Sequence, residues 1–107
     1  MVTAYKLVVY VPVTYADQVR TALGEAGAGR IGNYQYCSFS VRGIGRFLPV
    51  EGAKPMIGVV GQFEQVEEER IEVTCDATLL EEIVHAMKAV HPYEEVAYDL
   101  YPLTILP

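Results

Sequence analysis

Residues 5–11 read Tyr-Lys-Leu-Val-Val-Tyr-Val and are followed directly by Pro12. Valine and tyrosine are frequent in strands, and proline ends a strand because it cannot donate a ladder hydrogen bond. The run therefore predicts a central strand. Apolar residues at helical spacing come next, with Val19 and Leu23 on one side and Gly27 as a stop, so a helix follows the strand.

Three later runs are rich in β-branched and aromatic residues or alternate polar with apolar ones. They predict strands over 31–41, 66–74 and 96–105. Pro102 interrupts the last of these, which favours a position at the edge of a sheet.

The helix ends have their own signals. Thr14 can cap the first helix, and either Asp76 or Thr78 can open a second one whose apolar stripe runs to Val90. His91-Pro92 ends this second helix, because proline disfavours the helical conformation of the residue before it.

The resulting order is strand, helix, strand, strand, helix, strand. This order predicts an α+β fold of the ferredoxin-like, split βαβ type, with an antiparallel sheet and both helices on one face. A chain of 107 residues has room for one such domain, over residues 1–107. The other face of the sheet is left bare, and we expect oligomerisation to cover it.

Composition narrows the classes of function. The net charge of −6 argues against nucleic-acid binding, which needs a basic surface. No run approaches the roughly 20 apolar residues of a membrane helix, and no leader peptide is recognisable. Cys37 and Cys75 fit no zinc or redox spacing, so we expect a cytoplasmic protein with two ordinary thiols.

The segment 42–61 contains glycines and prolines that exclude a helix and predict a long bent hairpin or loop between the second and third strands. It also holds three basic residues, Arg42, Arg46 and Lys54, beside backbone that could approach an anion closely. Two interpretations stay open: an arm that clasps another subunit, or a sensing loop that binds a small anion.

Residues 91–95, His-Pro-Tyr-Glu-Glu, are the sharpest local motif. His91, Glu94 and Glu95 could ligate a divalent metal, although a lone histidine needs further ligands from other chains or segments. The structural alternative is a helix stop in which Tyr93 acts as an anchor. The run Glu67–Glu69 is interpreted as a solvated entry into a strand.

Three stretches together resemble a known domain. They are residues 29–47 with their continuation to Gly58, residues 61–72 (Gly-Gln-Phe-Glu-Gln-Val-Glu-Glu-Glu-Arg-Ile-Glu), and residues 91–99 (His-Pro-Tyr-Glu-Glu-Val-Ala-Tyr-Asp). The chain is similar to the domain inserted into many bacterial members of the Nif-three-like dinuclear-metal family, and to short stand-alone relatives of that insert. More loosely it resembles CutA, a trimeric divalent-cation-tolerance protein, and the PII signal proteins.

The resemblance implies a CutA/PII-like fold and a homotrimer, but no catalytic centre. The metal ligands of the Nif-three-like family belong to its larger flanking domain. We therefore expect no enzyme and no certain cofactor, but a homo-oligomeric binding or regulatory module that takes a small anion or a divalent metal between subunits. The alternative is a protein–protein interaction module without a small ligand, whose partner is itself or a separate Nif-three-like protein.

Overall fold

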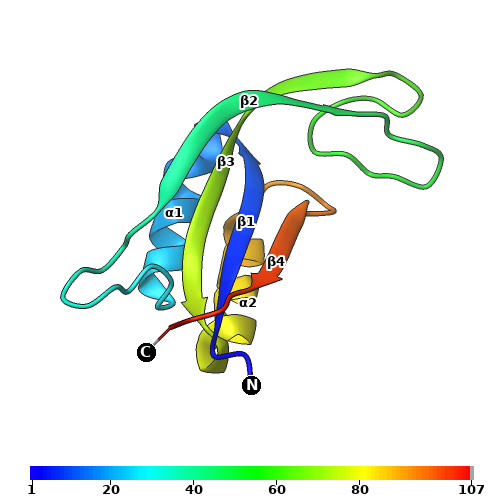
Figure 1. Cartoon of the computed structure of the whole chain (residues 1–107). Coiled ribbons are helices and arrows are strands. Elements are labelled where there is room, and N and C mark those ends of the chain that lie inside the picture. Colours follow the sequence, from blue (N-terminus) through cyan, green and yellow to red (C-terminus); the bar gives the residue numbers. More distant parts are fainter. Residues whose placement is uncertain (107) are drawn as a thin grey trace.

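The computed structural model describes residues 1–106 and contains the predicted order of strands and helices (Figure 1). Short 3₁₀ turns at Val13–Tyr15 and Ala77–Leu79 precede the two helices. The strands and helices are β1 (Ala4–Pro12), α1 (Ala16–Glu25), β2 (Phe39–Phe47), β3 (Glu64–Asp76), α2 (Leu80–Val90) and β4 (Tyr98–Pro102).

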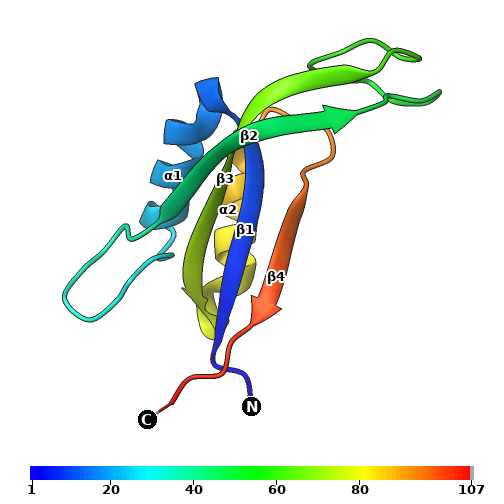
Figure 2. The same cartoon turned by 45° about the horizontal axis from the view of Figure 1, so that its top comes forward.

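The four strands form one sheet in the order β2-β3-β1-β4, and all neighbouring strands are antiparallel. β3 therefore lies between β1 and β2, and β1 lies between β3 and β4, which is the interleaving of a split βαβ fold. Both helices lie on the same side of this sheet (Figure 2). The predicted fold class is confirmed.

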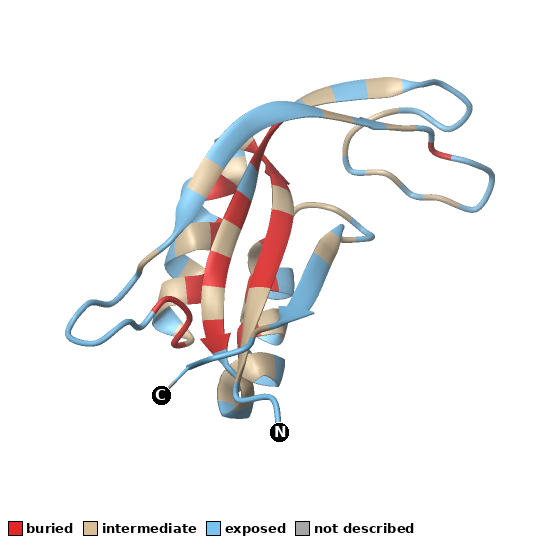
Figure 3. Cartoon of the chain, viewed as in Figure 1, coloured by how far each residue is buried: buried red, intermediate tan, exposed pale blue. Residues whose placement is uncertain are grey.

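The core lies between the helices and the two central strands (Figure 3). Side chains alternate between the faces of a strand, so every second residue of β1 and β3 points towards the helices. The buried core residues are Leu7, Val9, Val11, Ala16, Val19, Leu23, Ala28, Ile71, Val73, Cys75, Ile83 and Met87.

No helix of the described chain lies in front of the other face of the sheet, which looks towards the viewer in Figure 1. Residues paired directly across antiparallel strands share a face, so Val8, Tyr10, Val41 and Phe39 belong to this side. Phe39 is 64% exposed, and Val41 is exposed as well. We call this side the open face.

β2 and β3 continue beyond the rest of the sheet as a bent hairpin, so that the molecule measures 50 × 26 × 21 Å. We call the loop 48–63 together with the ends of these two strands the arm. The loop closes on itself where the Gly61 N–H donates to the Pro49 carbonyl (2.8 Å). The hairpin predicted over 42–61 is therefore present, but residues 42–47 are part of β2.

The second strand was predicted too early in the chain. Residues 31–38 form a loop with one isolated bridge, and the strand begins at Phe39. The physical reason lies in the backbone: Gly29 and Gly32 adopt positive φ values of 78° and 56°, and even Tyr36 has a φ of 59°. Such conformations bend the chain and cannot continue a strand.

Smaller differences concern ends and caps. The third strand is longer than predicted and the last one shorter, at 64–76 and 98–102. Asp76 is the residue that caps, since its carboxylate accepts the Thr78 N–H (2.8 Å), whereas Thr14 caps nothing. No helix in residues 1–106 is long and apolar enough to cross a membrane.

Substituting Gly29 tests the loop. The Gly29 N–H donates to Thr74 of β3 and its carbonyl accepts the Cys37 N–H, while a Cβ at residue 29 would overlap the Cys37 backbone. We expect Gly29→Ala to lower the free energy of unfolding by about 3 kcal/mol or more, from left-handed strain plus overlap. Gly32→Ala is the matched control, because it has positive φ but open space, and should cost only about 1–2 kcal/mol in urea denaturation. Equal losses would contradict this account.

Candidate binding site at the base of the arm

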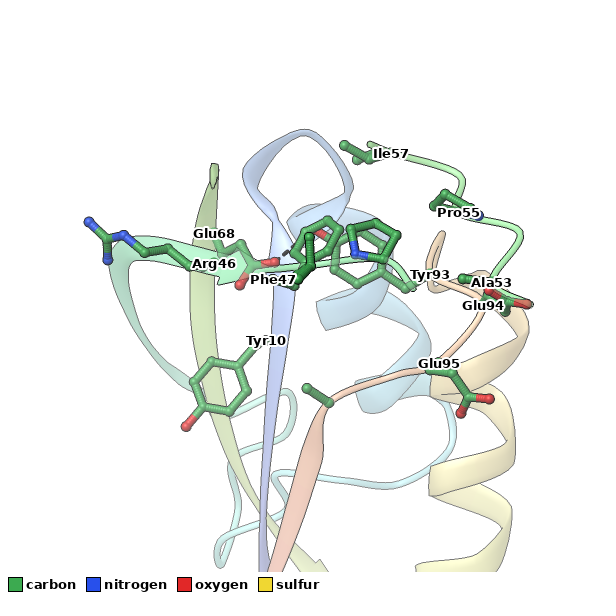
Figure 4. Close-up of a pocket in the computed structure, with 14 residues that line it drawn as sticks. Tyr10, Arg46, Phe47, Ala53, Pro55, Ile57, Glu68, Tyr93, Glu94 and Glu95 are labelled. Atoms are coloured by element: carbon green, nitrogen blue, oxygen red, sulfur yellow. Dashed lines mark hydrogen bonds between the residues drawn. The ribbon is translucent and has the colours of Figure 1, made fainter. Parts of the chain in front are cut away.

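A pocket of about 380 Å³ lies where the arm meets the connection between α2 and β4 (Figure 4). Its walls are mostly apolar, and they come from four separate parts of the chain. The lining residues are Tyr10 of β1, residues 45–49, 53, 55 and 57 of β2 and the arm, Glu68 of β3, and Tyr93, Glu94, Glu95 and Ala97 of the connection.

His91 fixes the path of that connection. It ends α2, where its N–H donates to the Met87 carbonyl, and its side chain is only 7% exposed. Nδ1 accepts the backbone N–H of Tyr93 (3.1 Å), so the proton must be on Nε2, which donates to the Tyr10 carbonyl (2.7 Å). Both ring nitrogens are thus engaged in holding residues 91–93 against β1.

This arrangement suits a neutral imidazole. Burial lowers the pKa of His91 below its ordinary value, although the hydrogen bond to the Tyr10 carbonyl and the nearby Glu68 carboxylate oppose the shift. A second proton on Nδ1 would face the Tyr93 N–H and break that bond.

Tyr93 is the anchor that the motif 91–95 predicted. Its hydroxyl donates to Oε2 of Glu68 (2.8 Å), and its ring packs edge-on against Phe47, with centroids 5.8 Å apart. Burial and the bond to Glu68 raise the pKa of Tyr93, so the hydroxyl keeps its proton and remains a donor. One side chain therefore joins the connection to both strands of the arm.

Glu68 was not predicted as a site residue, and the interpretation of Glu67–Glu69 as solvated is wrong for two of the three glutamates. Glu68 and Glu69 are both buried, at 9% and 8% exposure. Glu69 forms an ion pair with Arg20 of α1 on the helix side of the sheet. Glu68 lies on the opposite side, over Gly45, where any Cβ would overlap its carboxylate. The one signal in the sequence was the pair of glycines at alternate positions of β2, which leave room for a side chain from β3.

The predicted metal ligands are only partly brought together. Glu94 accepts the backbone N–H of Lys54 (3.0 and 3.3 Å), and Glu95 is an exposed residue of the pocket wall. His91 offers no free nitrogen lone pair in this arrangement. Within residues 1–106 no group of three or more histidine, cysteine, aspartate or glutamate side chains is placed to hold a metal ion. A metal site here stays a prediction that requires ligands from another chain.

The predicted anion ligands are exposed residues of β2 and the arm. Arg42 and Arg46 share the face of β2 opposite to Glu68, and the Arg46 guanidinium points away from the pocket in Figure 4. Lys54 lies in the arm loop, where its backbone N–H holds Glu94. An anion site made from these three residues also stays a prediction.

The two cysteines are free thiols, one buried and one half-buried. Cys75 is part of the core, and burial raises its pKa to about 11, so the unreactive thiol form prevails at neutral pH. Cys37 lies half-buried in the loop before β2.

The fold is that of the CutA proteins. The periplasmic divalent cation tolerance protein CutA from Archaeoglobus fulgidus superimposes with a TM-score of 0.69 over 97% of this chain and 87% of that chain, at 16% identity. CutA1 from Oryza sativa has the same TM-score over 99% of this chain and 84% of its own, at 18% identity. No protein-family model matches the chain.

The sequence is similar to Nif-three-like proteins, as its motifs predicted. A Bacillus cereus protein related to NIF3 superimposes with a TM-score of 0.83 and is 54% identical over 95% of this chain, but only 26% of that chain is covered. The GTP cyclohydrolase 1 type 2 homolog of Bacillus subtilis (strain 168) is 54% identical over 102 residues, which are 95% of this chain and 27% of the relative. That of Mycobacterium tuberculosis (strain ATCC 25618 / H37Rv) is 51% identical over 98 residues, with 92% and 26% covered. The predicted resemblance is confirmed, and the chain spans about a quarter of the length of the curated relatives it matches.

The pH dependence of stability tests the role of His91. The unfolded chain takes up a proton near the ordinary histidine pKa of 6.5, whereas folded His91 resists protonation. The free energy of unfolding should therefore fall as the pH drops below 6.5 towards the lower pKa of the folded state. Urea denaturation at several pH values should show a smaller fall in His91→Gln than in wild type. The exposed His85 provides the control, since His85→Gln should keep the wild-type slope. Identical slopes in all three proteins would contradict this assignment.

Proposed function

We propose that this chain is a non-catalytic, homo-oligomeric binding module of the PII/CutA type, with a ligand site at a subunit cleft beside the base of the arm. The observation that carries the proposal is the combination of an open sheet face with an arm rich in exposed apolar side chains. Monomeric proteins rarely leave contiguous apolar patches of this kind in water.

The exposed apolar residues are concentrated on β2 and the arm. Phe63, which directly precedes β3, is 85% exposed. The others on these two elements are Phe39, Val41, Ile44, Leu48, Val50, Met56, Val59 and Val60. A second copy that covered them would remove apolar surface worth roughly 25 cal/mol per Å² from water, which supports self-association through this region.

The state of the reactive groups supports a binding role over catalysis. His91 uses both ring nitrogens for structural hydrogen bonds, and Tyr93 holds its proton tightly. Cys75 is sealed in the core with a raised pKa. A general base or nucleophile needs a free lone pair near a substrate, and these groups are already engaged.

A second candidate function follows from the length of the chain. Because it spans about a quarter of its relatives, it could be an interaction module for a separate Nif-three-like protein, with no small ligand. The same exposed arm would then contact that partner instead of another copy.

Light scattering tests the assembly. We expect the mass of a trimer or another closed oligomer at micromolar concentration, and a monomer after residues 50–60 are replaced by Asn-Gly, which removes most of the exposed apolar arm. The replacement should leave the fold intact, because the Gly61–Pro49 hydrogen bond already brings the loop ends together.

Ile31→Ser is the control for this test, since it removes an exposed apolar side chain outside the arm and should leave the oligomer unchanged. A monomer mass for the wild-type protein would contradict the proposed homo-oligomer. If that monomer gained mass only when mixed with a Nif-three-like relative, the second candidate would replace the first. An intact oligomer after the arm replacement would assign the arm to sensing instead of assembly.

Calorimetry separates the two charged ligands that the sequence predicts. In the metal form of the proposal, His91, Glu94 and Glu95 from more than one subunit bind Zn²⁺ or Cu²⁺ at about pH 7.5 and lose it at about pH 5.5, where imidazole is protonated. His91→Ala should then abolish binding. In the anion form, Arg42, Arg46 and Lys54 bind inorganic phosphate, and Arg46→Gln weakens it. If none of these ions gives a saturable heat of binding, both forms of the proposal are excluded.

A further inference from the structure

The pocket at the base of the arm has an electrostatic character that does not match the predicted anion. Three carboxylates line it, those of Glu68, Glu94 and Glu95, against a single guanidinium. That guanidinium, on Arg46, points away from the pocket (Figure 4). The interior is therefore negative, on a chain that already carries a net charge of −6. Such a site repels anions and attracts cations.

The Glu68 carboxylate is short of hydrogen-bond donors. Within the described chain one hydroxyl, that of Tyr93, donates to Oε2, and no donor is paired with Oε1. The side chain is 9% exposed. A carboxylate can accept about four hydrogen bonds. Within residues 1–106 no buried side-chain oxygen or nitrogen lacks a partner, so Oε1, which has none in the chain, lies within reach of solvent. Oε1 is therefore an accessible acceptor for a ligand that carries N–H donors.

Aromatic rings flank this carboxylate. Figure 4 shows the rings of Phe47 and Tyr93 beside Glu68, and Tyr10 contributes a third ring to the lining. The rings of Phe47 and Tyr93 pack edge-on against each other. The face of an aromatic ring attracts positive charge, so this pair suits an organic cation. Proline, leucine and isoleucine side chains of the arm also line the pocket.

We propose that this pocket binds a small organic cation, in which an amidinium, guanidinium or alkylammonium group on an apolar body meets Glu68. This inference rests on the proposed ligand site and specifies the class of ligand. A bare divalent metal ion needs several oxygen or nitrogen ligands around it, whereas most of this wall is hydrocarbon. A volume of about 380 Å³ fits a molecule of a few rings or a short chain, which is why a free small molecule is the occupant.

Calorimetry with benzamidine on the full chain tests the proposal. Benzoate and benzyl alcohol are matched in size and ring but carry a negative charge and no charge, respectively. We expect benzamidine to bind at least about tenfold more tightly than either, because a charge-assisted hydrogen bond to a buried carboxylate contributes that much. Equal or tighter binding of benzoate would overturn the proposal.

Variants locate the binding site. Glu68→Gln keeps the size of the side chain and should weaken benzamidine about tenfold or more, whereas Glu82→Gln removes the same charge from an exposed position on α2 outside the pocket and should have little effect. Phe47→Leu keeps every charge and should weaken binding about threefold. It serves as the independent test if Glu68→Gln does not fold. Unchanged affinity in both Glu68→Gln and Phe47→Leu would place the site elsewhere.

Two further experiments identify the source of the cation and distinguish ligand binding from assembly. Agmatine represents a free guanidinium compound and acetyl-Gly-Arg-Gly-amide represents a protein side chain; a peptide that binds more tightly than agmatine would overturn the small-molecule assignment. If light scattering gives a monomer and this monomer binds benzamidine, the organic-cation site is supported and the proposed homo-oligomer is contradicted. If the protein is an oligomer that binds no organic cation, the homo-oligomer is supported and the organic-cation site is contradicted.

Discussion

Nine residues of β1 pair with nine of β3 in the middle of the sheet, from Ala4 opposite Asp76 to Pro12 opposite Glu68. This register decides which side chains share a face. It puts Leu7 opposite Val73 and Val9 opposite Ile71 on the helix side, where they form the core. A shift of β1 by one residue relative to β3 would turn its apolar side chains to the other face and place the buried valines in water. The helices, the open face and the pocket all inherit their positions from this one pairing.

The same alternation produces two buried glutamates with different roles. Neighbouring residues point to opposite faces, so Glu69 meets Arg20 of α1 while Glu68 reaches Tyr93 at the base of the arm. Each carboxylate depends on a partner from another part of the chain. The pocket is thus a consequence of where three segments meet: a strand, the arm that extends it, and a connection held by His91.

The sequence predicted the order of elements, both helices and the hairpin, because these depend on local periodicity and on glycine and proline signals. It also singled out residues 91–95, since His91-Pro92 is a local helix stop. It did not predict Glu68, because burial of that residue depends on Gly45 across the strand pair and on Tyr93, which is distant in the chain. The error over 31–38 has a related cause: aromatic residues such as Tyr34 and Tyr36 favour a strand by composition, while the backbone between Gly29 and Phe39 turns.

The pairing of β1 also determines when the molecule can fold. β1 is synthesised before both of its neighbours in the sheet, β3 and β4. Tyr5 therefore cannot pair until Cys75 on one side and Pro102 on the other have been synthesised. Contacts that close such long stretches of chain are entropically costly and form slowly. The hairpin of β2 and β3 and the first helix involve shorter separations and can form earlier, during synthesis. A ribosome must therefore release the stretch from β1 to β4 before the central strand gains its second partner, and until then the apolar stripe of β1 is available to chaperones or to the wrong neighbour.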